Sequence, residues 1–491
     1  MRMRRLAAAA VLAATAMTGT AHAQAPFAVD TSCFAPAPAG GDPAPGTPEW
    51  QARDTHNQYC STLRNRDQLS SPAFGFGNLS QGAELYAEQT VDRVSDPTNP
   101  RGGITTLVPG AKSADPFRTV RRWTEAGLGR VAPVKFPSLN GSTLRGHVWM
   151  PPASVKRPKR GFPGVVITDG SVQGYEELYF WAAQDLASNG YVVMTYDVQG
   201  QGDSDLYGDD CPGACSGVPY QQNYNFYQGA EDSLSFFLSG GNPFSDALDA
   251  SRVGIAGHSL GASAVSYVGQ CDNRVKTIVA WDNLRAITDC SGVTIPKQYR
   301  TDALINVPAM AITNDYAFNP QPMSKQPDPE SKEGGFKQIA AAGLDAQIVT
   351  IRNGTHLAYT HVPLVLPANE IGERMASYYT LAWFDLQLKR DASGFDRLTA
   401  ARFDDSVDRS SIGAGVYDPT KADPADPYSG NQPIMIEGIP VKDAVSFYYL
   451  SEYALHHPKS GKLAACADMR AGCASTAKAR KRHKRSRRAR R

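Results

Sequence analysis

Residues 252–263 read RVGIAGHSLGAS and contain a G-x-S-x-G pentapeptide, Gly257 to Gly261. An apolar segment that is typical of a strand runs into the pentapeptide, and small residues typical of a helix follow it. Glycines on both sides of the serine allow a tight strand-to-helix turn that exposes the hydroxyl at its tip. The helix N-terminus then places a positive dipole beside any negative charge that develops there. We therefore predict that Ser259 is a nucleophile.

A nucleophilic serine needs a histidine as general base. In strand–turn–helix sites of this kind the chain order is serine, acid, histidine. His356 follows an apolar segment, residues 347–351, and we predict that it is the base, with His361 as the alternative. The pair at 456–457 is expected to be solvated, and His483 falls in a basic tail.

The base in turn needs an acid that orients its ring. Asp315 ends a predicted strand, residues 309–313, and lies one strand before His356, so we predict that it is the acid. Asp282, at the end of the earlier predicted strand 277–281, is the alternative. Either aspartate could instead cap its loop.

The negative oxygen of an acyl-transfer intermediate needs two backbone N–H donors. The residue after the nucleophile, Leu260, is expected to supply one of them. The predicted strand 164–168 ends in Asp169-Gly170-Ser171, and the N–H of Ser171 is expected to supply the other.

The pattern around these residues predicts an α/β architecture. Residues 131–136 and 143–150 alternate apolar and polar around Asn140-Gly141, which is a hairpin signal. Beyond this hairpin, short apolar segments alternate with helical ones. Such an order is typical of a mainly parallel sheet with helices on both faces. We place this catalytic domain at residues 130–390.

Irregular extensions are expected on both sides of the domain. Residues 24–50 are rich in Pro, Ala and Gly, and residues 51–120 are polar with few periodic apolar positions. We therefore expect a linker and surface-wrapping segment over residues 24–129. Residues 391–477 are predicted to form a C-terminal extension, whose role the pattern does not indicate.

The two ends of the chain carry separate signals. Residues 1–23 combine a basic start, an apolar run too short to span a bilayer and a small-x-small site, which predicts a secretory signal peptide. Residues 478–491 carry ten Lys or Arg and no acid, which predicts a disordered tail that could tether the chain to an anionic cell envelope. The remaining residues hold 37 basic and 48 acidic side chains, which argues against specific nucleic-acid binding.

Eight cysteines lie beyond the predicted signal peptide, an even number that suits disulfides in an oxidising compartment. Sequence neighbours suggest four pairs, although 105 connectivities are possible for eight cysteines. The preferred pairs are Cys33 with Cys60, Cys211 with Cys215, Cys271 with Cys290, and Cys466 with Cys473. A zinc site is not expected, because the Cys211/Cys215 spacing has no matching pair of ligands nearby.

The chain resembles α/β-hydrolases of the dienelactone-hydrolase-like group, which includes bacterial polyester hydrolases, chlorophyllases and platelet-activating-factor acetylhydrolases. The resemblance covers about residues 130–390 and departs from many relatives at Asp169-Gly170, where those have His-Gly or Pro-Gly. The matching segments are NGSTL (140–144), LASNGYVV (186–193), RVGIAGHS (252–259), VAWD (279–282), Val307-Pro308 and AWF (382–384). The segment YDVQGQGDS (196–204) also resembles the loop after the strand in cocaine-esterase-like and prolyl-peptidase-like relatives.

This resemblance implies a serine hydrolase that cleaves carboxylic esters through an acyl-enzyme on Ser259. The predicted signal peptide makes secretion the expected location, and no cofactor or metal is expected. The aromatic segment 207–227 is expected to border the site and to receive an acyl or aryl group. A secreted serine peptidase of related fold and a non-catalytic surface protein on a hydrolase scaffold are the alternatives.

Overall fold

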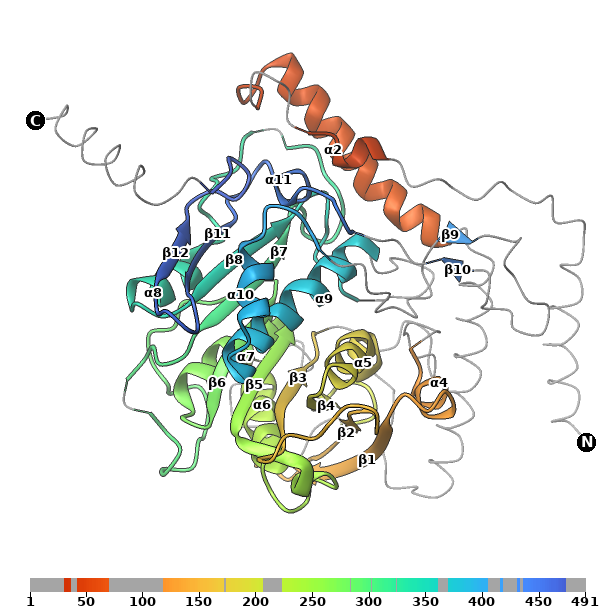
Figure 1. Ribbon diagram of the computed structural model, residues 1–491, viewed down its shortest axis with the longest axis vertical. Coiled ribbons are helices and arrows are strands. Elements are labelled where there is room, and N and C mark those ends of the chain that lie inside the picture. The colour runs from red at the N-terminus through yellow and green to blue at the C-terminus, as the bar shows by residue number, and fades with distance from the viewer. Residues whose placement is uncertain are drawn as a thin grey trace, which may run out of the picture.

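The computed structural model describes residues 31–36, 42–69, 118–171, 174–205, 223–404, 416–417, 431–432 and 436–473, apart from residues 283, 302, 324 and 361–369. One large sheet crosses the molecule and helices cover both of its faces (Figure 1). The predicted signal peptide, the basic tail and most of the aromatic segment 207–227 lie outside the described residues.

The large sheet has ten strands in the order β1-β2-β4-β3-β5-β6-β7-β8-β11-β12. These strands are β1 (Arg130–Pro137), β2 (Thr143–Met150), β3 (Phe162–Thr168), β4 (Val192–Asp197), β5 (Leu248–His258), β6 (Val275–Trp281), β7 (Ala309–Asn314), β8 (Ala346–Ile351), β11 (Glu452–His456) and β12 (Leu463–Cys466). The pair β9 (Val416–Tyr417) and β10 (Asn431–Gln432) forms a separate small sheet.

The sheet is mixed, so the prediction of a mainly parallel sheet holds only in part. The six central strands, β4 to β8 in the sheet order, run parallel to their neighbours. Two antiparallel strands flank them on each side, namely β1 and β2 on one edge and β11 and β12 on the other. The α/β class is therefore confirmed, with antiparallel additions at both edges.

Helices on both faces bury most of the central strands, apart from the start of β5 and one position of β6, which explains their largely apolar sequences. On β3, Val165 and Ile167 face one apolar cluster and Val166 faces the other. The first cluster includes α5 (Phe180–Ser188) and α9 (Glu370–Phe384). The second includes α6 (Asn223–Phe237), α7 (Leu260–Cys271) and α8 (Gly334–Ala341).

The shorter helical elements connect these layers or cover their ends. They are η1 (Thr31–Phe34), α4 (Val120–Glu125), η2 (Glu176–Tyr179), η4 (Ser245–Ala247), η5 (Asp385–Lys389), α10 (Ala392–Thr399) and α11 (Val441–Ala444). None of the helices in the described part of the chain is long and apolar enough to cross a membrane.

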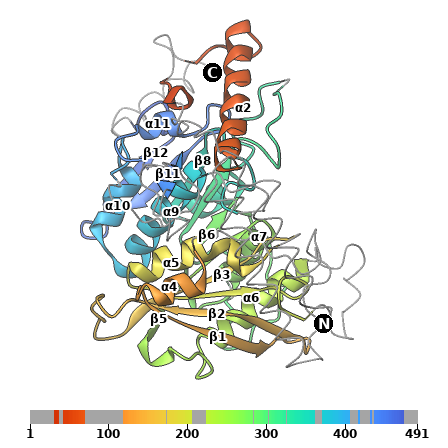
Figure 2. The same ribbon diagram turned by 90° about the vertical axis from the view of Figure 1, so that its right-hand side faces the viewer.

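The N-terminal extension contains a long helix, which corrects the expectation that residues 51–120 are irregular. Helix α2 spans Pro48–Leu69, 22 residues, and both ribbon views place it at the end of the molecule that carries α11, away from β1 and β2 (Figures 1 and 2). Its buried face is largely polar, because Asp54 and Asn57 lie on it beside Trp50. A search for apolar periodicity therefore could not find it.

The C-terminal extension is part of the sheet rather than a separate unit. Strand β11 pairs with the edge of β8, with Glu452 opposite Ile348, and β12 pairs with β11. Beyond α9, the chain thus returns to cover the edge that β8 would otherwise expose. The sheet extends about 75 residues beyond the predicted boundary at residue 390.

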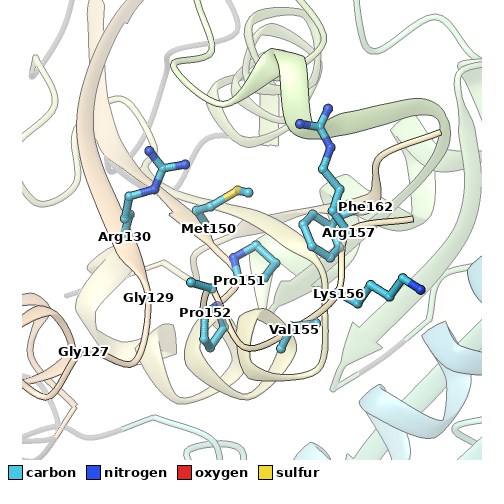
Figure 3. A pocket seen from close by; sticks show the side chains of 11 residues that line it. Gly127, Gly129, Arg130, Met150, Pro151, Pro152, Val155, Lys156, Arg157 and Phe162 are labelled. Atoms are coloured by element: carbon cyan, nitrogen blue, oxygen red, sulfur yellow. The ribbon is translucent and has the colours of Figure 1, made fainter. Parts of the chain in front are cut away.

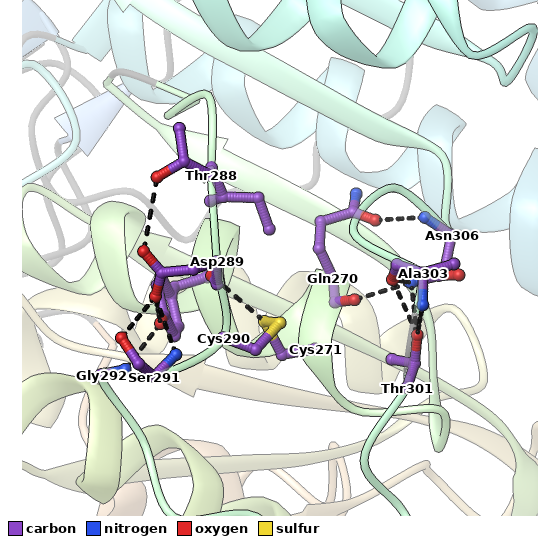
Figure 4. Close-up of a disulfide and its surroundings, with 12 residues drawn as sticks. Gln270, Cys271, Thr288, Asp289, Cys290, Ser291, Gly292, Thr301, Ala303 and Asn306 are labelled. Atoms are coloured by element: carbon purple, nitrogen blue, oxygen red, sulfur yellow. Dashed lines mark hydrogen bonds between the residues drawn. A yellow bond between two sulfur atoms is a disulfide. The ribbon is translucent and has the colours of Figure 1, made fainter.

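Three of the four preferred disulfides are present in the structure. Cys33–Cys60 joins η1 to α2, Cys271–Cys290 joins the end of α7 to the following loop, and Cys466–Cys473 closes a short loop after β12. Figure 4 shows Cys271–Cys290 beside Asp289, whose carboxylate accepts hydrogen bonds from the N–H and hydroxyl of Ser291. Cys211 and Cys215 lie outside the described residues.

We predict that replacing Cys271 and Cys290 together by serine lowers the free energy of unfolding by about 3 kcal/mol, because the bridge closes a loop of 19 residues in the unfolded chain. Urea denaturation of the oxidised protein measures the change. Loss of Cys466–Cys473, which spans 7 residues, should cost less, about 2 kcal/mol. Unchanged stability of the Cys271/Cys290 variant would contradict the expectation.

Candidate active site

Ser259 lies on the sharp turn between β5 and α7, with a φ of 57° and a ψ of −116°. Glycine is required on both sides because there is no room for a side chain. A Cβ on Gly261 would lie 2.2 Å from the carbonyl oxygen of Asp169, and one on Gly257 would lie 2.5 Å from that of Gly261. The packing of β5, α7 and the loop after β3 thus holds the serine in a backbone conformation that non-glycine residues rarely adopt.

Two further side chains form a hydrogen-bonded chain with this serine. The Nε2 atom of His356, in the loop after β8, lies 2.9 Å from Oγ of Ser259. Its Nδ1 atom lies 2.9 Å from Oδ2 of Asp282, which directly follows β6. All three side chains come from the carboxyl ends of parallel strands, and Ser259 and His356 remain partly exposed. The arrangement matches a nucleophile, a base and an acid that orients the base.

The aspartate that contacts His356 is Asp282 and not Asp315, the first choice made from the sequence. Strand β6 is hydrogen-bonded directly to β5, whereas β7 lies one strand further out. Asp282 has a φ of 111°, a backbone conformation that non-glycine residues rarely adopt. Asp315 is buried and accepts hydrogen bonds from Asn57 Nδ2 at 2.8 Å and from the N–H of Asn353 at 2.6 Å.

The electrostatic environment favours an ionised Asp282. Burial by itself favours the neutral form, but the hydrogen bond from His356 and the nearby positive charges outweigh this effect and lower the pKa of Asp282. An ionised carboxylate at Nδ1 fixes the imidazole with Nε2 free to accept the serine proton.

A second histidine, His258, links the backbone of the loop after β3 to the backbone of His356. Its Nε2 lies 2.8 Å from the carbonyl oxygen of His356, which can only accept, so we assign the proton to Nε2. Its Nδ1 then accepts from the hydroxyl of Tyr179 at 2.9 Å, and that hydroxyl accepts from the N–H of Gly170 at 3.0 Å. No sequence pattern predicted this network, although His258 lies inside the pentapeptide.

The predicted oxyanion donors lie close to the nucleophile. Leu260 is the first residue of α7, so its N–H has no partner within the helix. The loop that carries Gly170 and Ser171 passes over Ser259, since a Cβ on Gly170 would lie 3.2 Å from Cβ of Ser259. The position of Ser171 is thus compatible with a donor aimed at the oxygen that forms on an attacked carbonyl.

The other histidines weighed from the sequence do not join the site. His456 Nδ1 lies 2.7 Å from Asp345 at the β11 edge, and the ring of His457 packs against Phe395. His361 and His483 lie outside the described residues.

Two other places in the described residues were candidates for a ligand. The side chains of Cys33, His56 and Cys60 are the one group there that lies close enough together to bind a metal ion, but the two cysteine sulfurs form a disulfide. A cavity of about 480 Å³ between the start of β1 and the loop 151–157 is lined by Arg130, Met150 and Phe162 among others (Figure 3). It lies at the amino end of β3, whereas Ser259 follows the carboxyl end of β5.

Comparison with known proteins finds two distant relatives that are both named as alpha/beta hydrolases. No family model matches the chain. The "Alpha/beta hydrolase psoB" of Aspergillus fumigatus is 26% identical over 168 residues, which cover 34% of this chain and 36% of psoB. The "Alpha/beta hydrolase ucsC" of Acremonium sp is 29% identical over 157 residues, which cover 32% of this chain and 30% of ucsC.

These two relatives support an alpha/beta hydrolase. The match spans about a third of the length of each relative. The ten-stranded sheet with helices on both faces agrees with that fold.

We predict that the network around His258 makes the protein less stable in acid. Burial, followed by the charge of His356, lowers the pKa of His258 to about 3. In the unfolded chain His258 has a pKa of about 6.5 and binds a proton below that pH, whereas in the folded chain it stays neutral down to about pH 3. The free energy of unfolding therefore falls as the pH decreases from about 6.5 to about 3. Between about pH 6.5 and about pH 5 the loss due to His258 should be about 2 kcal/mol.

Urea denaturation of the native chain and of His258→Gln at the two pH values measures this contribution. The variant keeps a hydrogen-bonding amide but does not titrate, so its stability should fall less with decreasing pH. Parallel curves for the two proteins would contradict the expectation.

Proposed function

We propose that the chain is a secreted serine hydrolase of the dienelactone-hydrolase-like group that cleaves carboxylic esters through an acyl-enzyme on Ser259. The observation that carries the proposal is the chain of two 2.9 Å contacts from Ser259 through His356 to Asp282, located on a strand-to-helix turn. The two alpha/beta hydrolase relatives support hydrolysis as the reaction class.

In the proposed reaction, His356 takes the proton of the Ser259 hydroxyl as Oγ attacks the ester carbonyl. The carbonyl oxygen becomes negative and accepts hydrogen bonds from the N–H groups of Leu260 and Ser171. Asp282 holds Nδ1–H and stabilises the imidazolium. The imidazolium then protonates the departing alcohol, and His356 activates a water molecule that releases the acid and regenerates Ser259.

An apolar group beside the base favours an ester with an acyl or aryl group. The side chain of Phe318 is 59% exposed, and its ring lies 4.9 Å from that of His356 in an edge-on arrangement. A large exposed aromatic ring beside a nucleophile can lose water contact when it packs against an apolar substrate group. Phe318 is thus an apolar contact that the structure adds to the aromatic segment 207–227 expected from the sequence, most of which lies outside the described residues.

Export agrees with the three disulfides, which form and persist in oxidising compartments. The signal peptide and the tether formed by residues 478–491 remain proposals that rest on the sequence alone.

Active-site labelling with a fluorophosphonate tests the proposed function. We expect the native chain to be labelled, Ser259→Ala to be inert, and Asp282→Asn to lower kcat on p-nitrophenyl esters by about 10³- to 10⁴-fold, because the imidazole loses its orienting charge. Labelling that survives Ser259→Ala would refute the nucleophile. Efficient cleavage of peptide amides with feeble ester turnover would favour a peptidase, and an inert native chain would favour a non-catalytic protein.

The role of Phe318 gives a separate prediction. Phe318→Ala should raise KM for p-nitrophenyl esters of long acyl chains by about 10-fold. The acyl chain then loses the apolar surface of one ring against which it would be buried. The acetyl ester, which is too short to cover the ring, should be affected less. Steady-state kinetics over a series of chain lengths measures this difference, and an equal effect on all chain lengths would exclude Phe318 as a substrate contact.

A further inference from the structure

The buried face of helix α2 reaches the loops that carry the catalytic groups. Asn57 is only 1% exposed, and its Nδ2 donates to Oδ2 of Asp315 at 2.8 Å and to the hydroxyl of Tyr316 at 3.0 Å. Asp315 and Tyr316 directly follow β7. A side chain 258 residues earlier in the chain therefore completes the hydrogen bonding at the end of this strand.

The same carboxylate oxygen of Asp315 accepts a hydrogen bond from the N–H of Asn353 at 2.6 Å. Asn353 has a φ of 50°, a left-handed conformation, and lies three residues before His356 in the loop after β8. Asp315 thus fixes the point at which this loop leaves its strand.

Backbone hydrogen bonds continue this contact up to the proposed base. The N–H of Tyr316 donates to the carbonyl oxygen of Gly354 at 3.0 Å, and the N–H of His356 donates to that of Ala317 at 2.5 Å. The loops 315–317 and 353–356 therefore run side by side, and the anchor at Asp315 lies at one end of this pairing.

We propose that Asn57 and Asp315 are positioning residues for His356, so that one side chain of helix α2, Asn57, helps to place the proposed base. This inference rests on the proposed function, because it assigns a role around the same base. Neither residue touches the proposed reacting atoms, and both act through the Asn353–His356 loop.

A buried carboxyl group holds a backbone N–H most strongly while its own donors keep it ionised. Burial raises the pKa of Asp315, whereas the hydrogen bond with Ser446, followed by those from Asn57 and the Asn353 N–H, opposes this rise. Loss of Asn57 removes one donor and favours the neutral acid, which binds the Asn353 N–H more weakly. The loop that carries His356 is then free to shift, and a displacement of about 1 Å at a catalytic group can cost about 10²-fold in rate.

The deciding experiment compares two substitutions on the same buried face of α2. Asn57→Ala removes the donor to Asp315. Asp54→Asn is the control on the same face, because Asp54 accepts from the hydroxyl of Tyr448 and from the N–H of Met323 at 3.1 Å and makes no contact with Asp315. Its link to the anchor runs only through the Tyr448 and Tyr316 hydroxyls, which lie 3.4 Å apart, and it leaves the Asn57–Asp315 hydrogen bond in place. For each full-length variant we would measure kcat and KM on p-nitrophenyl acetate, the rate of fluorophosphonate labelling, and Tm.

We expect Asn57→Ala to lower kcat and the labelling rate by about 10- to 100-fold with little change in KM, because the reacting geometry is disturbed while substrate contacts are kept. Asp54→Asn should keep kcat within about two-fold of the native value, even if its Tm falls as much as the Tm of Asn57→Ala. If Asn57→Ala does not fold, Asn57→Ser replaces it in the experiment. Serine keeps a small donor, so this variant should also lose kcat, but by a smaller factor than Asn57→Ala.

Native kcat in a folded Asn57 variant, or an equal loss of kcat in Asp54→Asn, would overturn the inference. Those outcomes are separate from failure of the proposed function, which would appear as a native chain that is not labelled at Ser259.

Discussion

The backbone conformation at Ser259 is the constraint on which the rest of the site depends. A φ of 57° at a residue with a side chain costs about 1–2 kcal/mol, and only surrounding packing can impose it. That packing is the approach of α7 to the loop after β3, where Gly261 lies against the carbonyl oxygens of Thr168 and Asp169. The same approach brings the Gly170 loop over the serine, so one close contact sets both the exposure of Oγ and the place of the second predicted oxyanion donor.

His356 has to match this fixed serine, and its backbone is held from two directions. On one side, His258 donates to its carbonyl oxygen, and the network continues through Tyr179 to Gly170. On the other side, its N–H donates to the carbonyl oxygen of Ala317. Most of these partners are buried, which strengthens their hydrogen bonds and makes a lost partner costly. The first network ties His356 to the loop after β3, and the second ties it to the loop after β7, which Asn57 of α2 contacts.

The parts of the structure that depend on local chemistry could be predicted from the sequence. The hairpin around Asn140-Gly141, the turn at Ser259 and the pairing of cysteines close in sequence each follow from a few adjacent residues. The acid could not be decided in this way, because Asp282 and Asp315 both end apolar strands. Only the order of β5, β6 and β7 in the sheet shows which of them can reach the histidine.

Helix α2 and strand β11 escaped prediction for a different reason. The helix is anchored through Asp54 and Asn57, so its buried positions carry no apolar periodicity. The buried positions 50, 54, 57 and 61 do have helical spacing. Their burial can be recognised only once the partners of Asn57 and Asp54 are known, namely Tyr316 after β7 and Tyr448. Strand β11 pairs with an edge strand about 100 residues earlier in the chain, and no local signal indicates that partner.

The two strand-end aspartates show how the fold assigns different tasks to the same residue type. Asp282 is partly exposed and faces His356, and its pKa is lowered once that contact outweighs burial. Asp315 is buried one strand further out, and burial raises its pKa although several donors oppose this. The charge of Lys332 favours the ionised form of both.

Environments that push two carboxyl pKa values apart mark different roles. Here the carboxylate that faces the histidine can stabilise a transient imidazolium, whereas the enclosed one suits a fixed backbone contact. The aspartate after β7 therefore anchors the loop after β8, whereas the aspartate after β6, on the strand beside Ser259, carries the charge that faces His356.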